Sequence, residues 1–471
     1  MGFSSISFLF YFLPPFFLVY YLVPRRLKNI AALLGSLAFY AWGEPTCFLL
    51  IAAATLANYG LGLWMRRARR LALATGLTLD LGLLFLFKYL GFFAGILGAD
   101  ITALPLPLGL SFFVFQALSY QFDVFRGTVE PERRVDRFAL YLLLFPRVMQ
   151  GPLTRYEQFH SQLDDRPITA DGVGDGCLRF AVGLAKKLLL ANSLGTLADR
   201  IWGTPDAAAA TAWLGLLAYT MQIYFDFSGY TDMAIGLGRM MGFQLPENFN
   251  YPYLCRSVSE FWRRWHITLG QWFRDYVYFP LGGSRVGRLR LVCNLLVVWT
   301  LTGFWHGANW TFLLWGLYFG LLLCAEKLLR LEKRRIPAIL RHGFCLLAVM
   351  LGWVLFRSAS IGEATAFLGR LFGRGGALDP DTLLYLHDNA LLLLVGAVGC
   401  TPLLRAGCAR LSRRFPAVSA ALRAVEAGSA LAATIAMVSM YFFIAARCIL
   451  ALGEAGNFPA AIKVTAEYFP K

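Results

Sequence analysis

Residues 291–329 read LVCNLLVVWTLTGFWHGANWTFLLWGLYFGLLLCAEKLL, which is two apolar runs separated by a short segment with a histidine. The second run, residues 310–329, is long enough to cross a bilayer, because roughly 20 helical residues span the hydrocarbon core. Similar runs recur along the chain of 471 residues. The stretch therefore predicts a helical membrane protein, with one ionisable group placed where such groups are expensive.

The composition supports this interpretation for the whole chain. Apolar residues make up 58% and charged residues 15% of the sequence, against roughly 45–50% and 25% in soluble proteins. These figures exclude intrinsic disorder, and the 9 cysteines have no metal-site spacing. The net charge is +16, with 44 basic and 28 acidic residues. The basic residues cluster between apolar runs, which is typical of cytoplasmic membrane loops and not of nucleic-acid binding.

Basic clusters at residues 25–28, 66–70 and 126–137 predict the cytoplasmic side of the membrane. The apolar runs predict roughly 11 transmembrane helices. Several runs are too short to cross alone, so interfacial and re-entrant helices are also expected. Irregular backbone at membrane depth must be covered by protein or line a cavity. The expected fold is an all-α polytopic membrane protein around a central tunnel. Shorter or later runs lie at residues 138–148, 178–190, 213–227, 233–243, 344–356, 391–404 and 430–452.

Residues 257–278, SVSEFWRRWHITLGQWFRDYVY, have a different pattern. Aromatic residues recur at helical spacing, and most charged residues fall on the opposite side. One continuous amphipathic helix in the membrane interface is expected. The alternative is a buried helix whose arginines reach outward to water.

Two of the five histidines are candidates for chemistry. His306 lies between two apolar runs and is flanked by glycines, which permit close approach of a ligand or another backbone. A neutral imidazole in an apolar site is suited to general-base catalysis. The alternative is a structural imidazole bonded to a carbonyl in the helix bundle. His266, within residues 257–278, is the second candidate, and a surface histidine is its alternative.

Other polar residues give weaker signals. His160 begins HSQLDD, which matches the HxxxD pattern of soluble acyltransferases, but we interpret this match in a polar loop as chance. His342 and His387 carry no signal. Asp226 and Asp232 are either anchors that hydrogen-bond helices together or part of a polar cavity lining. The sequence contains no P-loop and no Gly-x-Ser-x-Gly motif, so a serine-enzyme mechanism has no support.

Two long phrases resemble a known family. EFWRRWHITLGQWFRDYVYFPLGG (residues 260–283) and GFWHGANWTFLLWGLYFG (residues 303–320) are similar to segments of the membrane-bound O-acyltransferase family. They resemble most the bacterial branch that contains alginate O-acetyltransferase. Supporting stretches follow the same order and cover most of residues 1–445, the expected acyltransferase core. They lie at residues 107–127, 145–159, 226–253 and 353–358.

The resemblance implies roles for individual residues. His306 takes the place of the family's catalytic histidine, and His266 that of the second histidine of its motif pair. Trp305, Asn309 and Asp226 are candidates for lining a tunnel or stabilising an oxyanion. No metal and no bound cofactor is implied.

The donor implied is a cytoplasmic thioester, either acetyl-CoA or an acyl carrier protein. Such donors are anionic, and Arg263, Arg264 and Arg274 would bind them on the cytoplasmic face. The implied function is an O-acetyltransferase of the bacterial inner membrane, which moves acetyl groups for O-acetylation of an exopolysaccharide, alginate or alginate-like. Periplasmic acetyltransferase proteins would be its partners.

Two alternatives stay open at this point. A D-alanyl transferase for teichoic acid shares the two-histidine pattern, although the longer match to FPLGG and GFWHGANW disfavours it. A transporter or channel would need a charged midplane site and paired repeats of broken helices, and the sequence indicates neither. Residues 446–471 are atypical, because they resemble a fragment of a major-facilitator transporter.

Overall fold

A computed structural model describes residues 2–99, 104–403, 406–407 and 410. These residues form helices and turns, and no strand occurs among them. Two apolar helices, Ser7–Leu22 and Phe48–Trp64, are shorter than a full span. The described residues thus form an all-helical structure with several candidate membrane spans, as the composition predicts. The expected run at residues 430–452 and the tail at 446–471 lie outside the described residues. Within the described part, 6 helices are long and apolar enough to cross a membrane: Arg69–Ile96, Ala170–Trp202, Arg288–His306, Trp310–Leu328, Ala338–Arg357 and Pro380–Gly399.

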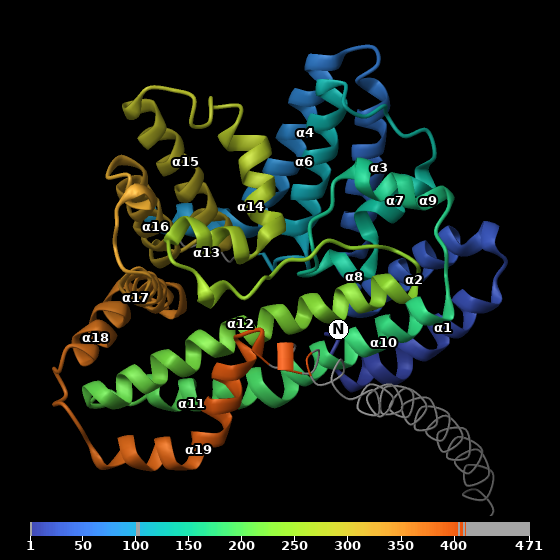
Figure 1. Ribbon diagram of the computed structural model, residues 1–471. Helices are drawn as coiled ribbons and strands as arrows, with labels where there is room; N and C mark the ends of the chain where they lie inside the picture. The colour runs from blue at the N-terminus through green and yellow to red at the C-terminus, as the bar shows by residue number, and fades with distance from the viewer. Residues whose placement is uncertain (1, 100–103, 404–405, 408–409, 411–471) are drawn as a thin grey trace, which may run out of the picture.

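Three helices of the N-terminal half, α3 (Phe48–Trp64), α4 (Arg69–Leu84) and α6 (Leu110–Arg126), pack side by side (Figure 1). Each contributes one member of a buried polar network. Asn58 Nδ2 donates to Asp80 Oδ1 at 2.8 Å, and Gln121 Nε2 donates to Asp80 Oδ2 at 3.0 Å. Lipid supplies little drive for helix association, so such hydrogen bonds hold the three helices together. The remaining elements here are η1 (Ser7–Phe12), α1 (Leu13–Leu22), η2 (Arg25–Leu27), α2 (Lys28–Gly43), η3 (Phe85–Tyr89), α5 (Leu90–Ile96), α7 (Val135–Leu143), α8 (Phe145–Val148) and α9 (Tyr156–Asp164).

A long hairpin forms the centre of the chain. Its first arm comprises α10 (Ala170–Ala185), η4 (Lys186–Ala191) and α11 (Asn192–Trp202), which lie along α12 (Ala209–Met240) in Figure 1. Glycines permit this close approach: a Cβ atom at Gly183 would lie 2.5 Å from the carbonyl oxygen of Gly229. Small residues at such crossings are typical of membrane helices.

The prediction of separate runs at residues 213–227 and 233–243 is wrong, because α12 passes through both without a break. Gly229, the glycine between the runs, packs against α10 instead of ending the helix. Asp226 and Asp232 therefore project from one helix. Lys187 Nζ lies 2.5 Å from Asp226 Oδ1, and Lys186 Nζ lies 2.6 Å from Asp232 Oδ2. These ion pairs tie α12 to the first arm, as the anchoring interpretation predicts.

The C-terminal half begins with two short helices where one long helix was expected. The chain breaks between α13 (Val258–Arg264) and α14 (Ile267–Phe273), so the prediction of a continuous helix over residues 257–278 is wrong. A neighbouring segment replaces the helical hydrogen bonds there. Asn250 N donates to Arg264 O and Ile267 N donates to Asn248 O, both at 3.0 Å. The elements that follow are η6 (Arg274–Tyr278), α15 (Arg288–His306), α16 (Trp310–Leu328), η7 (Leu331–Lys333), α17 (Ala338–Arg357), α18 (Ile361–Leu371) and α19 (Pro380–Gly399), with η5 (Pro252–Leu254) before α13.

Tryptophan rings fill the space between α13, α15, α16 and α17. Trp262 lies 4.6 Å from Trp299 and 4.9 Å from Phe319, measured between ring centroids. Trp315 and Trp353 complete this aromatic core, and both are about 1% exposed. Large rigid rings bury much area at low entropic cost. The core therefore fixes the end of α15, where His306 lies.

Candidate active site

Two histidines from distant segments meet around the ring of Trp305. The ring centroid of Trp305 lies 4.8 Å from that of His306 and 6.3 Å from that of His266. His266 and Lys88 are both within electrostatic range of His306. The structure thus brings together the two histidines that the sequence singled out, and it adds a lysine.

His306 is the last residue of α15, and two side chains hold that helix end in place. Tyr89 Oη donates to the carbonyl oxygen of Phe304 at 3.0 Å, and Lys88 Nζ donates to the carbonyl oxygen of Trp305. These carbonyls belong to the last helical turn, whose acceptors lack partners within the helix. The negative end of the helix dipole also favours a cation there. The π-helical turn η3 places both donors at this point.

The imidazole of His306 is half-buried among aromatic rings. Its ring centroid lies 5.1 Å from those of Trp315 and Phe356 and 6.4 Å from that of Phe312. Within the described part of the chain, its nitrogens make no hydrogen bond. The alternative interpretation, in which His306 is a structural residue hydrogen-bonded to a carbonyl, is therefore not supported by a hydrogen bond among the described residues. The ring is left available for a ligand.

His266 is held by Asn248 on the segment that crosses the break between α13 and α14. Its Nδ1 lies 3.2 Å from Asn248 Oδ1, which also accepts from the backbone N–H of Thr268 at 3.1 Å. Because the backbone can only donate, the Asn248 atom is an acceptor, and Nδ1 of His266 must carry the proton. Nε2 then presents its lone pair. It is buried and has no partner among the described residues.

The imidazole of His266 is only 4% exposed. Burial lowers the pKa of His266 to about 3, because an apolar environment disfavours the charged form. His266 is therefore neutral at every physiological pH. Its Nε2 can accept a hydrogen bond from a hydroxyl group, while the more accessible His306 can take up a proton.

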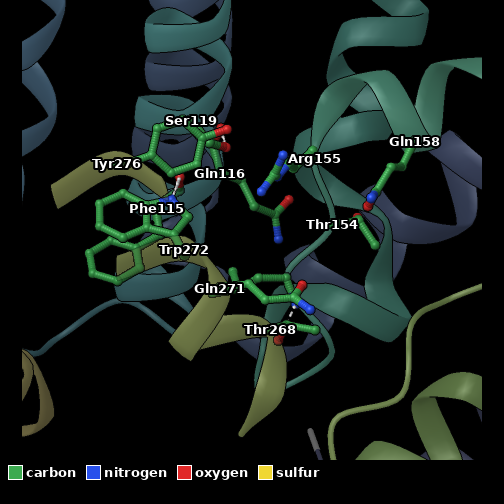
Figure 2. A pocket seen from close by; sticks show the side chains of 11 residues that line it. Phe115, Gln116, Ser119, Thr154, Arg155, Gln158, Thr268, Gln271, Trp272 and Tyr276 are labelled. Carbon is green, nitrogen blue, oxygen red and sulfur yellow. Dashed lines mark hydrogen bonds between the residues drawn. The ribbon is translucent and has the colours of Figure 1, made fainter. Parts of the chain in front are cut away.

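A narrow pocket, with about 20 Å³ of space that water could enter, lies beside this site between α6, α14 and the segment before α9 (Figure 2). Phe115 forms its inner wall, since its ring centroid lies 4.0 Å from that of Trp272 and 5.3 Å from that of Trp305. Thr268 also lines the pocket and donates to Asn248 Oδ1 at 3.0 Å. Phe115 thus connects the pocket to Trp305, the neighbour of His306, and Thr268 connects it to Asn248, which holds His266.

Polar groups line the rest of this pocket. Gln116 is 1% exposed, and its Nε2 has no partner within the described residues. The wholly buried Arg147 holds the other end of this amide, with its Nη2 3.2 Å from Gln116 Oε1. Arg155 lies at the pocket and pairs with Asp275.

The three predicted donor-binding arginines differ in their surroundings. Arg264 Nη2 lies 2.7 Å from Glu260 Oε1, and Arg274 Nε lies 2.9 Å from Asp275 Oδ1. Arg263 is exposed at the end of α13. None of the three lines the pocket of Figure 2. Two of these charges are therefore already balanced by carboxylates.

Of the other predicted site residues, one lies at the site and two take part in structural contacts. Trp305 is at the centre of the site, and its Nε1 is buried without a partner among the described residues. Asn309 caps α16: its Oδ1 accepts from Thr311 N at 3.2 Å, and its Nδ2 donates to Ala359 O at 2.8 Å. Asp226 pairs with Lys187 as described above, and the structure does not bring it to the histidines by any contact.

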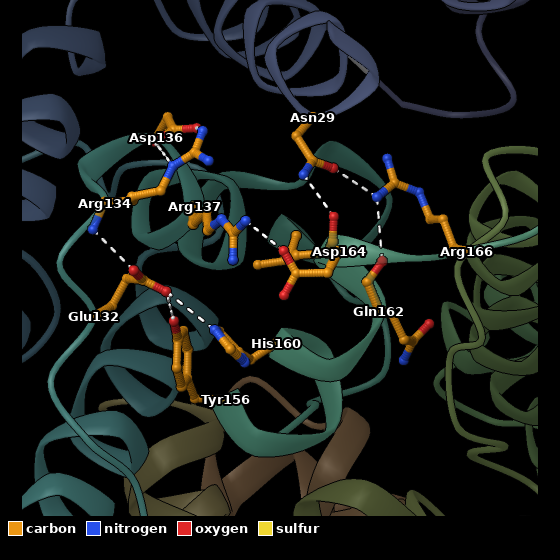
Figure 3. Close-up of polar contacts among 11 residues, drawn as sticks. Asn29, Glu132, Arg134, Asp136, Arg137, Tyr156, His160, Gln162, Asp164 and Arg166 are labelled. Atoms are coloured by element: carbon orange, nitrogen blue, oxygen red, sulfur yellow. Dashed lines mark hydrogen bonds and ion pairs between the residues drawn. The ribbon is translucent and has the colours of Figure 1, made fainter. Parts of the chain in front are cut away.

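The remaining histidines take other roles. His160 lies in helix α9 and not in a loop, which corrects the expectation, and its Nε2 is 3.4 Å from Glu132 Oε2 (Figure 3). His342 Nδ1 lies 2.8 Å from the carbonyl oxygen of Cys255. His387 is exposed beside Asp388. No contact links these three to the site at Trp305.

Sequence reasoning missed three residues at the site. Of the three, only Lys88 gave a signal in the sequence, because a lysine within an apolar segment, here the candidate span Arg69–Ile96, is a functional candidate by default. Asn248 and Gln116 are ordinary amides in sequence. Their positions follow only from the crossing of segments far apart in the chain.

Two histidines that meet around a buried tryptophan, one of them kept neutral by burial, form a site suited to acyl or proton transfer. Residues 37–338 match the membrane-bound O-acyltransferase family, and this range contains both histidines, Lys88 and Asn248. The chain belongs to the membrane-bound O-acyltransferase family and is an acyltransferase.

The relatives narrow the class further. The chain is 43% identical to the probable alginate O-acetylase AlgI of Azotobacter vinelandii over 392 residues, which cover 80% of this chain and 79% of that protein. It is 32% identical to the peptidoglycan O-acetyltransferase of Helicobacter pylori over 425 residues, or 79% of this chain and 80% of that protein. The teichoic acid D-alanyltransferase of Bacillus subtilis is 30% identical over 230 residues, which cover 46% of this chain and 58% of that protein.

Proposed function

We propose that this protein O-acetylates an exopolysaccharide, alginate or an alginate-like polymer, with acetyl groups that it takes from a cytoplasmic thioester. The observation that carries the proposal is the meeting of His306 and His266 around Trp305 in a chain of this family. The names of the relatives support acetyl as the group transferred. Acetyl-CoA and an acyl carrier protein are the two donors considered.

In the proposed reaction, His306 is the general base. It takes the proton of the acceptor hydroxyl as that oxygen attacks the thioester carbonyl carbon. The tetrahedral intermediate then collapses, the carbon–sulfur bond breaks, and the sulfur takes the proton back from His306. The neutral Nε2 of His266 would accept a hydrogen bond from a second hydroxyl of the acceptor sugar and so orient it, while the reacting hydroxyl donates to His306. Lys88, a cation close to His306, would stabilise negative charge on the carbonyl oxygen.

The finer architecture also belongs to this proposal. We place the protein in the bacterial inner membrane with roughly 11 spans around a tunnel that lets donor and acceptor arrive from opposite sides. Arg263 on the exposed end of α13 would meet the anionic part of the donor. Periplasmic acetyltransferase proteins would complete transfer to the polymer.

The alternatives are weaker on specific grounds. The D-alanyltransferase relative matches less than half of this chain, whereas the O-acetyltransferase relatives match about four fifths. A transporter or channel is disfavoured by membership of an acyltransferase family. The peptidoglycan relative makes a cell-wall acceptor the nearest competitor to an exopolysaccharide.

The test is production of His306→Gln in cells that lack their own copy, with acetyl content of isolated polymer and peptidoglycan measured by NMR. We expect polymer acetylation to fall by at least about a hundredfold, the usual contribution of a general base, with unchanged protein in the membrane. His387→Gln is the matched control, because that side chain is exposed far from any site contact. Full acetylation by His306→Gln would reject the assignment, and loss of acetyl groups from peptidoglycan alone would reject the acceptor.

A further inference from the structure

A second cleft, separate from the histidine site, lies beside the basic cluster at residues 25–28. It has a volume of about 500 Å³ and opens to solvent between η2, the start of α2 and the segment after α9. Its lining is basic and polar. The residues are Tyr21, Arg25, Lys28, Asn29, Leu163, Asp164, Arg166, Pro167 and Ile168.

The acidic groups near this cleft are already paired with other residues. Asp164 pairs with Arg137, as Figure 3 shows, and Arg25 pairs with the neighbouring Asp165. Within the described part of the chain, Lys28 and Arg166 have no carboxylate in ion-pairing distance. The cleft therefore holds two positive charges that no anion of the described chain balances.

Arg166 is built into the wall of the cleft. It is 8% exposed, and its planar guanidinium lies over the ring of Phe243, with Cζ 4.0 Å from the ring centroid. Its Nη1 donates to Asn29 Oδ1 at 2.6 Å, and its Nη2 donates to Tyr20 Oη at 3.1 Å. These partners are neutral, so they orient the guanidinium without cancelling its charge.

Lys28 faces the same space from the start of α2. Its Nζ donates to the carbonyl oxygens of Tyr20 and Tyr21 at the end of α1. Burial and the nearby charge of Arg166 lower the pKa of Lys28. Two like charges are thus held together at an energetic cost, which a bound anion would offset.

The position of the cleft favours one source of anion. The positive-inside bias predicts that residues 25–28 lie at the cytoplasmic surface, where anionic lipid headgroups are concentrated. The adjoining helix α1 exposes Leu18 at 62%, Val19 at 55% and Leu22 at 76%. Apolar residues beside a basic cleft give acyl chains a surface next to the site of the headgroup.

We propose that the cleft between Lys28 and Arg166 binds a phosphate group, supplied by the headgroup of an anionic phospholipid whose acyl chains lie along α1. Arg166 and Asn29 would form the fixed wall, and Lys28 would be the adjustable contact. This site is independent of acetyl transfer at His306.

The experiment measures lipid binding to the purified full-length protein by native mass spectrometry, with phosphatidylglycerol and phosphatidylcholine as probes. We expect wild type to prefer phosphatidylglycerol, and Lys28→Gln to weaken that binding about tenfold through loss of one charge-assisted hydrogen bond. Arg26→Gln is the matched control, since Arg26 belongs to the same cluster, is exposed and does not line the cleft.

Each outcome decides the proposal. Equal weakening by Lys28→Gln and Arg26→Gln would show general surface attraction and overturn a specific site, as would the absence of any preference between the lipids. Inorganic phosphate and coenzyme A form the second arm, read as a shift in melting temperature. If either stabilises wild type but not Lys28→Gln, and phosphatidylglycerol does not bind, the site takes a soluble phosphate and the lipid source is overturned.

Discussion

Lys88, on the π-helical turn that follows α4, donates a hydrogen bond to the carbonyl oxygen of Trp305, the residue before His306. Its ammonium also lies 3.2 Å from Ser111 Oγ and 5.5 Å from the centroid of the Trp305 ring. One side chain thereby joins α4, α6 and the end of α15. The helix end that carries His306, the proposed general base, is thus held by a residue more than two hundred positions earlier in the chain.

Replacing Lys88 by methionine tests this dependence. The Trp305 carbonyl would lose its donor, at a cost of about 1–3 kcal/mol for a buried unsatisfied group. We expect a lower melting temperature and at least about a tenfold fall in acetylation. Lys88→Arg keeps a cationic donor and should retain more activity. A wild-type rate of polymer acetylation by Lys88→Met would reject the inference that Lys88 positions His306.

Asn248 provides a test of how His266 is oriented. Asn248→Leu removes the acceptor that holds Nδ1, so the imidazole can take the other tautomer or rotate, and acetylation should fall by about tenfold or more. Asn248→Asp keeps an acceptor at the same place and should retain most of the activity. The two variants should differ in rate at equal protein levels in the membrane. Equal activities would mean that Asn248 does not position His266.

The buried state of His266 also predicts a dependence of stability on pH. Its pKa is lowered to about 3 in the folded protein, against about 6.5 in an unfolded chain. Between these values the unfolded state binds more protons, so stability falls as the pH falls below about 6.5, by up to about 1.4 kcal/mol per pH unit from this group.

Melting temperatures of the detergent-purified protein between pH 7 and pH 5 measure this effect. His266→Asn removes the titrating group, so its melting temperature should fall less over that range than that of wild type. Parallel curves for the two proteins would show that His266 is not kept neutral by burial.

The packing of α10 on α12 predicts that two glycine-to-alanine substitutions in α10 change the stability of the protein in different directions. A Cβ atom at Gly183 would lie 2.5 Å from Gly229 O and 2.7 Å from Met233 N, so Gly183→Ala forces the backbones apart. The expected cost is about 1–3 kcal/mol. Gly174, on the same helix, has nothing within 4 Å of such an atom.

Gly174→Ala should therefore leave stability unchanged or raise it by about 0.5–1 kcal/mol, because alanine is the better helix former. Thermal unfolding of the two purified variants checks the contrast. A similar loss in both would place the effect in helix α10 itself and not in its contact with α12.

The sequence predicts membrane class, helical content and both histidines, because these follow from local composition and from motifs that lie within single segments. It misplaces the end of one helix at residues 227–233 and the continuity of another at residues 257–278. In each case a distant segment decides the outcome. Gly229, which looks like a break in α12, is a contact with α10. Backbone groups of Asn248 and Asn250 take the hydrogen bonds that a continuous helix over residues 257–278 would have made.

The same reason explains which site residues were found. His306 stands out because it is a polar residue within an apolar stretch, whereas Asn248 is polar in a polar stretch and becomes notable only through its contact with His266. Lys88 had the same local signal as His306. Asn309 was proposed from its place next to the motif, but its amide is engaged in helix capping.

His266 has a backbone φ of 44°, a left-handed conformation that few residues other than glycine adopt without cost. His266 thus supplies both the imidazole of the site and the backbone conformation that forms the bend between α13 and α14. Alanine at this position would remove the imidazole and also strain the left-handed backbone, so a loss of activity could not be assigned to either effect alone. Asparagine tolerates the left-handed conformation and glycine favours it. Comparing the alanine, glycine and asparagine variants therefore separates the effect of the backbone bend from the effect of losing the imidazole.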